Sequence, residues 1–212
     1  MSDNAKTLVP RGKTYYAGGT ASATQGKTKG LLGQTARFKD TDPGYNAARD
    51  SRSTYNPSHP TLSGMWCHAV FVKNTSGTTL RAGQPVIWKA GQYGLEVDDG
   101  VAAKDEIAGF VDDHIVGNVA DDDCFWCFYK GPQYVVVADG ATIAEGDALH
   151  TAAVADSSDL DGVLTVDETG TQDDGTIMGL ARAEVGIAAE AKVASSGVLK
   201  IRALLDVKNG LG

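Results

Sequence analysis

The chain has few cysteines, few aromatic side chains and no long apolar run, and each shortage excludes a class of protein. Three cysteines among 212 residues are too few, and odd in number, for the disulfide framework of a small secreted domain. Aromatic residues make up only 7% while glycines number 26, a balance typical of many short strands and turns. Because no run of about 18 apolar residues occurs and the start Met1–Asn4 is polar, we expect neither a membrane span nor an export signal.

The net charge of −8 is unevenly distributed along the chain. Residues 1–60 carry nine lysines and arginines against four acidic residues, whereas residues 61–212 carry ten against 23. A basic extension on an acidic body predicts an interaction arm for an acidic partner surface, and a solvated tail is the alternative. The acidic body argues against nucleic-acid binding, because neutralisation of phosphates supplies most of that affinity.

The N-terminal segment, residues 1–60, has few large apolar side chains, and glycines interrupt it throughout. No helical or strand period persists over a useful window. Such a segment cannot bury enough apolar surface to offset its own ordering entropy. The sequence therefore predicts an extended irregular arm over 1–60 that a neighbouring subunit holds in place, followed by a folded body over 61–212.

From Pro60 onwards, short β-branched and aromatic runs alternate with turn residues, a pattern that predicts a mainly β body, either a barrel or a sandwich. A turn is expected at Gly131-Pro132, followed by a strand at Tyr134–Ala138 and a second turn at Asp139-Gly140. Ala181–Ala194 is the main helix candidate, although Gly186 weakens it. The other strands are expected at Met65–Lys73, Gln84–Lys89, Leu95–Val97, Ile107–Val111, Cys124–Tyr129 and Val198–Leu205, with a further strand from Ala148.

The body contains an internal repeat. Two pairs of segments match, Leu80–Val86 with Ile143–Leu149, and Ile107–Val111 with Ile177–Ala181. A predicted strand follows the second segment of each half. The repeat predicts two related β units that make one barrel, with Gly83 and Gly146 in equivalent bends. Chance similarity between turn motifs is the alternative.

The order of these motifs resembles a known family. The segments AGQPV, IAGFV, GPQYVVVADGATIAEGDAL, GTIMGLARAEV and VLKIRALLD together look like the small β-barrel decoration, or cement, proteins of tailed-phage capsids. The resemblance covers roughly residues 65–207 and depends on turn glycines and strand pattern. It implies a non-enzymatic virion protein on the outer capsid surface that stabilises the shell. Its partners would be the major capsid protein and further copies of itself, with a trimer favoured over a dimer.

On this interpretation the N-terminal arm runs across neighbouring capsid subunits, so that each contact raises the effective concentration of the next. The arm residues expected to bind the capsid are Arg11, Lys13, Tyr15, Tyr16, Lys27, Lys29 and Arg37. A soluble β-rich binding module of a phage tail or adhesion device is the alternative function.

An enzyme is the third hypothesis and rests on one loop. Ala21–Thr28 matches a loose form of the phosphate-binding loop, in which Lys27 would contact the phosphates of a nucleotide. That mechanism needs a buried strand before the loop and a helix after it, and the flanking glycine-rich sequence provides neither. A basic arm segment is the simpler interpretation.

Two further motifs are interpreted as structural. Cys124 and Cys127 have redox spacing, but positions i and i+3 of a strand point to opposite faces, so their sulfurs cannot pair. Ser157–Glu168 nearly matches an EF-hand calcium loop, but it begins with serine and lacks flanking amphipathic helices. It is interpreted as a solvated acidic loop. The sequence predicts no metal, cofactor or catalytic residue, and it places the pairs Asp98-Asp99, Asp112-Asp113 and Asp173-Asp174 in surface turns.

Overall fold

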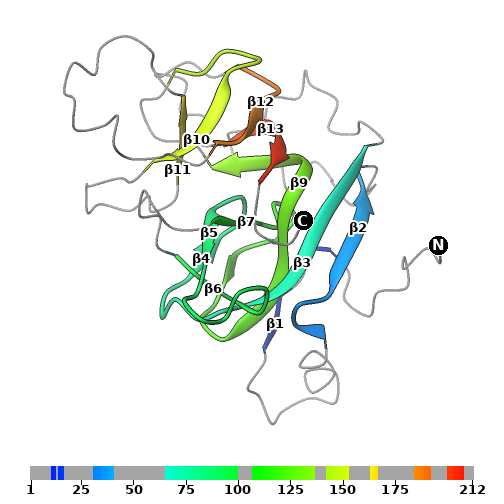
Figure 1. Ribbon diagram of the computed structural model, residues 1–212, viewed down its shortest axis with the longest axis vertical. Coiled ribbons are helices and arrows are strands. Elements are labelled where there is room, and N and C mark those ends of the chain that lie inside the picture. The colour runs from blue at the N-terminus through cyan, green and yellow to red at the C-terminus, as the bar shows by residue number, and fades with distance from the viewer. Residues whose placement is uncertain are drawn as a thin grey trace.

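The computed structural model describes residues 11–12, 14–16, 31–40, 65–99, 107–136, 142–152, 163–166, 184–191 and 200–207 (Figure 1). These residues form a mainly β protein, as the sequence predicts, and no α-helix is found among them. The described part of the chain accordingly holds no helix long and apolar enough to cross a membrane. The strands are β1 (Tyr15–Tyr16), β2 (Thr35–Lys39), β3 (Trp66–Asn74), β4 (Leu80–Arg81), β5 (Pro85–Trp88), β6 (Glu96–Asp98), β7 (Ile107–Val111), β8 (Asn118–Val119), β9 (Asp123–Val136), β10 (Ala148–Ala152), β11 (Val163–Val166), β12 (Glu184–Ala188) and β13 (Lys200–Asp206).

Five of the strands close into a barrel. Their order around the ring is β3, β6, β5, β7 and β9, and the ring closes because β9 pairs with β7 on one side and with β3 on the other. The β3–β6 pair is parallel, and the other pairs are antiparallel. This ring occupies the lower half of the molecule in Figure 1. The barrel prediction is therefore confirmed, and residues 66–136 supply the whole closed ring.

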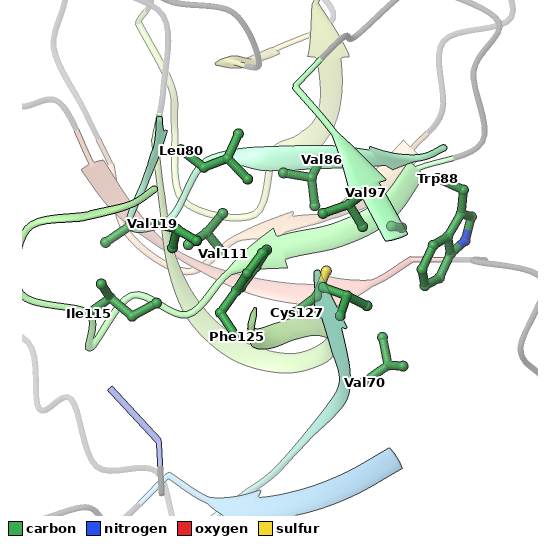
Figure 2. Close-up of a cluster of buried hydrophobic side chains, with 13 residues drawn as sticks. Val70, Leu80, Val86, Trp88, Val97, Val111, Ile115, Val119, Phe125 and Cys127 are labelled. Atoms are coloured by element: carbon green, nitrogen blue, oxygen red, sulfur yellow. The ribbon is translucent and has the colours of Figure 1, made fainter. Parts of the chain in front are cut away.

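The interior of the ring is apolar because every strand contributes alternate side chains to it. Phe125 and Cys127 of β9 face this interior, while Cys124 and Trp126 face a second cluster on the outer side of β9. Figure 2 shows the interior cluster, whose labelled members are Val70, Leu80, Val86, Trp88, Val97, Val111, Ile115, Val119, Phe125 and Cys127.

The strand β9 is 14 residues long and belongs to two parts of the fold. Its first half pairs with β3, and its second half pairs with β13. The predicted turn at Gly131-Pro132 is wrong, because both residues lie inside this strand. Gly131 has φ of 94°, and a Cβ there would lie 2.4 Å from the carbonyl oxygen of Trp66. A glycine at this position lets the strand bend against β3 as it changes partner.

The strands that follow β9 make a second unit, in the order β11, β10, β12, β13 and the second half of β9. The predicted helix at Ala181–Ala194 is wrong, since Glu184–Ala188 is the strand β12 between β10 and β13. Hydrogen bonding to two neighbouring strands overrides the helix propensity of this alanine-rich segment, which Gly186 already weakens. At its centre, Gly186 has φ of 154° and lies against the backbone of Leu204.

The two units repeat one hydrogen-bond pattern. In each, a bend glycine donates its N–H to the last residue of a strand, and that residue donates back to the residue after the glycine. The bonds are Gly83 to Val111 (2.9 Å) and Val111 to Gln84 (2.8 Å), and Gly146 to Ala188 (2.8 Å) and Ala188 to Asp147 (2.8 Å). The equivalence of Gly83 and Gly146 is confirmed. The counterpart of β7 is β12 rather than the predicted Ile177–Ala181, which lies outside the described residues.

The register irregularities repeat as well. The pairing of β5 with β7 shifts between Val86 and Ile87, and the pairing of β10 with β12 shifts between Leu149 and His150. A bend, a bulge and a glycine at matching places go beyond what similar turn motifs would produce by chance. The body therefore contains two copies of one β unit. The prediction that both copies together make one barrel is wrong, because the first copy alone closes the ring and the second extends from it through β9.

The described parts of residues 1–60 lie against this body. β1 pairs with the start of β9, and β2 pairs along its whole length with β3. The ring of Phe38 packs edge-on against Trp126 at 5.3 Å between centroids, and Tyr15 packs against Phe71 at 6.3 Å. The apolar pattern of Thr35–Lys39 is too short to predict a strand, and the aromatic cluster on β9 provides the missing stabilisation.

The repeat makes a prediction about glycine. A Cβ on Gly109 would lie 2.5 Å from the carbonyl oxygen of Phe128, and one on Gly186 would lie 2.2 Å from that of Leu204. We expect Gly109→Ala and Gly186→Ala each to lower the free energy of unfolding by about 3 kcal/mol or more, through strain and backbone displacement. Chemical denaturation measures the loss.

The matched control is Gly77→Ala. Gly77 also has positive φ (77°), but a Cβ added there would have nothing within 4 Å, so only the conformational cost of about 1 kcal/mol applies. Equal losses in all three variants would contradict the close approach of the strands at Gly109 and Gly186.

Candidate functional site

Two buried arginines join distant parts of the chain where the two units meet. Arg11 precedes β1, and Arg202 lies on β13. Each forms an ion pair with aspartate, and the side chains of both pairs are at most 9% exposed. A buried charge costs several kcal/mol unless a partner and hydrogen bonds satisfy it. We call these groups the polar junction: Arg11, Asp40, Asp112, Asp113, Gln133, Glu190 and Arg202.

Arg11 makes three side-chain hydrogen bonds in the junction. Its Nε donates to Oδ1 of Asp112 at 2.9 Å, and its Nη2 donates to Oδ1 of Asp113 at 2.5 Å and to Oε1 of Gln133 at 2.9 Å. The guanidinium carbon lies 4.4 Å from the centroid of the Phe128 ring, a cation–π contact. The planar, multiply donating guanidinium matches this arrangement, and a lysine would not.

Backbone N–H groups complete the coordination of the two carboxylates. Asp112 accepts from Gly12 at 2.5 Å and from His114 at 3.1 Å. Asp113 accepts from Tyr134 of β9 at 2.9 Å. Asp112 thus holds both the side chain of Arg11 and the backbone of Gly12, which fixes the N-terminal segment at two consecutive residues.

Arg11 and Asp113 each stabilise the charged form of the other. Burial acts to raise the pKa of Asp113, but the nearby Arg11 and His114 outweigh it and leave the pKa below its ordinary value. Burial likewise opposes the charge on Arg11, yet Asp113 and Asp112 raise its pKa above the usual range for arginine. Both partners are therefore ionised at neutral pH.

The second pair ties the end of β2 to β13. The guanidinium of Arg202 donates to Oδ2 of Asp40, the residue that follows β2. The N–H of Arg202 donates to Oε1 of Glu190 at 2.9 Å, and its guanidinium lies 5.3 Å from the centroid of the Tyr134 ring. Asp40 also donates its N–H to the carbonyl of Met65 at 2.8 Å. The N-terminal segment is thus attached to the body at both ends of its described part.

The sequence-based placement of Asp112-Asp113 in a surface turn is wrong. Asp112 is 1% exposed and Asp113 is 9% exposed. Two acidic residues after a strand are typical of a solvated turn. Here they are buried because they pair with Arg11, which lies about 100 residues earlier in the chain. Asp98 and Asp99 are half-buried, and Asp173-Asp174 lies outside the described residues.

The structure separates the residues that the sequence predicts for capsid binding. Arg11 is buried in the junction, Tyr15 packs on the body and Arg37 is exposed on β2. Tyr16 is described only as part of β1, and Lys13, Lys27 and Lys29 lie outside the described residues, as does the phosphate-loop candidate Ala21–Thr28. No motif in the sequence marks Asp112, Asp113 or Gln133 as the hydrogen-bond partners of Arg11.

The cysteines are structural. Cys124 and Cys127 point into clusters on opposite faces of β9, as predicted, and all three thiols are free and buried. Burial raises the pKa of Cys67 to about 11 and that of Cys124 to about 12, and it raises the pKa of Cys127 further. Protonated thiols are poor nucleophiles. Within the calcium-loop candidate Ser157–Glu168, Val163–Val166 is the strand β11, and the rest lies outside the described residues.

No family model and no curated protein matches the chain. Among solved structures, one chain of the capsid of Myoviridae phage XM1 is similar, with a TM-score of 0.48 and 17% identity over 78% of this chain and 99% of that one. The N base of the head fiber gp8.5 of bacteriophage phi29 is similar with a TM-score of 0.37 and 14% identity, over 65% of this chain and 92% of that one. With TM-scores below 0.5, neither similarity carries an argument about function.

The junction predicts a large effect for one substitution. Arg11→Met leaves two buried carboxylates without their cation, so we expect the free energy of unfolding to fall by about 3–5 kcal/mol. The matched control, Arg37→Met, removes an exposed arginine and should change it by about 0.5 kcal/mol or less. Urea denaturation of both variants measures the difference, and similar values would contradict the structural role of Arg11.

The same pair predicts a dependence on pH. Because the pKa of Asp113 in the folded protein lies below its unfolded value of about 3.9, its stabilising effect is present above that value and is lost as pH falls through the folded pKa. The difference in unfolding free energy between wild type and Arg11→Met should therefore shrink as pH falls from about 5 towards about 2. A difference that stays constant over this range would exclude coupling between Arg11 and an ionised Asp113.

Proposed function

We propose that the protein is a non-enzymatic structural component of a tailed-phage virion, a decoration or cement protein that binds the outer surface of the capsid. In this role it binds the major capsid protein, associates with further copies of itself as a trimer, and stabilises the shell. The resemblance of residues 65–207 to such proteins suggests this class.

One structural observation carries the proposal: the anchoring of the N-terminal segment. Arg11 and Gly12 are fixed to Asp112, and Asp40 is fixed to Arg202. Tyr16 and Leu31, which flank Lys27 and Lys29 in the sequence, both lie on the body. A cement protein must transmit force between the subunits that it bridges, and buried ion pairs with several hydrogen bonds each resist such force better than exposed ones.

The body itself supports a mechanical role. Four fully buried aromatic side chains, Phe71, Phe125, Trp126 and Phe128, come from the paired strands β3 and β9. The two β units share β9, so they are joined by continuous strand pairing and not by a linker. A partner bound to one unit is thus connected rigidly to the other. When several associated copies bind around a symmetry axis, each bound copy raises the effective concentration of the next, so modest contacts add up to tight overall binding.

Cosedimentation with heads tests the proposal. Heads purified from a mutant of the encoding phage that lacks this protein should carry the added wild-type protein into the pellet. They should also withstand heating better than undecorated heads. If the protein stays in the supernatant and instead binds tails, the alternative of a tail or adhesion module replaces the capsid role. Lys27→Glu with Lys29→Glu should weaken head binding, because we propose that the part of the chain that carries these cations contacts the shell.

A further inference from the structure

One exposed face of the body carries a cluster of cations and aromatic rings on an otherwise acidic protein. Arg37 on β2 stands opposite His68 on β3, and His68 stands opposite Lys130 on β9. Residues paired across strands lie on the same face of a sheet, so these three side chains form a row across three neighbouring strands. In Figure 1, β2 and β3 lie side by side on the right of the molecule.

Aromatic side chains extend this row. Trp66 lies two residues before His68 on β3, hence on the same face, and it is 42% exposed. The ring of Tyr129 lies 6.1 Å from that of His68, centroid to centroid. We call Arg37, Trp66, His68, Tyr129 and Lys130 the basic–aromatic face.

Arg37 and Lys130 both act on His68, which is consistent with their proximity. Burial lowers the pKa of His68, and Arg37 and Lys130 lower it further. One anion lies at the margin, Asp206, whose Oδ1 is 3.0 Å from the Nζ of Lys130. Both partners of that pair are more than half exposed, so it stabilises little and can exchange for another carboxylate.

The opposite sides of the same strands are fully occupied. Phe38, Cys67 and Ala69 pack into the cluster around Trp126 and Phe128. The basic–aromatic face is thus the other side of a well-packed sheet, and strand pairing positions its side chains, with a bulge between His68 and Ala69. Such a surface is preorganised, which reduces the entropy cost of binding.

We propose that the basic–aromatic face is a docking surface for an acidic protein surface of the shell. Charge complementarity identifies the partner: the face is cationic although the whole chain carries a net charge of −8. Its composition also matches that of binding hot spots, in which Trp, Tyr and Arg are enriched. This inference rests on the proposed function, and it names the body surface that would act together with the N-terminal segment.

Charge reversal with a matched control tests the docking surface. Arg37→Glu and Lys130→Glu each place a carboxylate on the face, whereas Arg81→Glu makes the same change on β4, an exposed position outside it. The probe is heads that lack this protein, with bound and free protein separated by sedimentation. We expect each face variant to bind about tenfold or more weakly than wild type, because like charges across an interface oppose association. Arg81→Glu should bind as wild type does.

The possible outcomes are distinguishable. If wild type fails to bind heads, the proposed function and the docking surface are both lost. If wild type binds and all three variants bind equally well, the docking surface alone is wrong. If the face variants change the oligomeric state of the free protein and leave head binding intact, the face joins copies of this chain, and the proposal is again overturned. Urea denaturation should show Arg37→Glu and Lys130→Glu to be folded, with midpoints close to that of wild type, since exposed substitutions change stability little.

Discussion

The burial of two adjacent carboxylates, Asp112 and Asp113, is the constraint on which the structure depends. Unpaired, these charges would oppose folding by several kcal/mol each. Arg11 removes that cost by forming hydrogen bonds with both, and Gly12 and Tyr134 add backbone donors. Arg11 and Gly12, from a segment with few apolar residues, are thus held on the body because its buried carboxylates require a cation and N–H donors. Part of the charge asymmetry of the sequence is therefore used inside the protein, where Arg11 of the basic segment pairs with Asp112 and Asp113 of the acidic body.

The shared strand β9 is the second organising element. One strand serves two β units because glycine and proline at its centre allow it to bend and change partner without ending. The repeated bend, bulge and glycine show that the second unit follows the plan of the first. The Gly131–Leu149 stretch is therefore the join between the copies, and its described residues contribute packing and pairing.

Local patterns in the sequence predict much of this fold. Alternation and turn residues place β3, β5, β6 and β7 within a residue or two, and matched glycines identify the repeat. Features set by distant residues are not predictable in this way. The helix expected around Gly186 is a strand because two neighbours pair with it, and Gly131-Pro132 continues a strand because β3 and β13 exchange there. The polar junction is unpredictable for the same reason: the burial of Arg11, Asp112 and Asp113 depends on partners that are distant in the sequence.

The separation of Arg11 from its partners has a consequence for synthesis on the ribosome. Arg11 leaves the ribosome 101 residues before Asp112, and Asp40 leaves it 162 residues before Arg202. A guanidinium cannot leave water before a carboxylate is there to receive it. Arg11 therefore reaches its buried position only after the barrel strand that precedes Asp112 has been made.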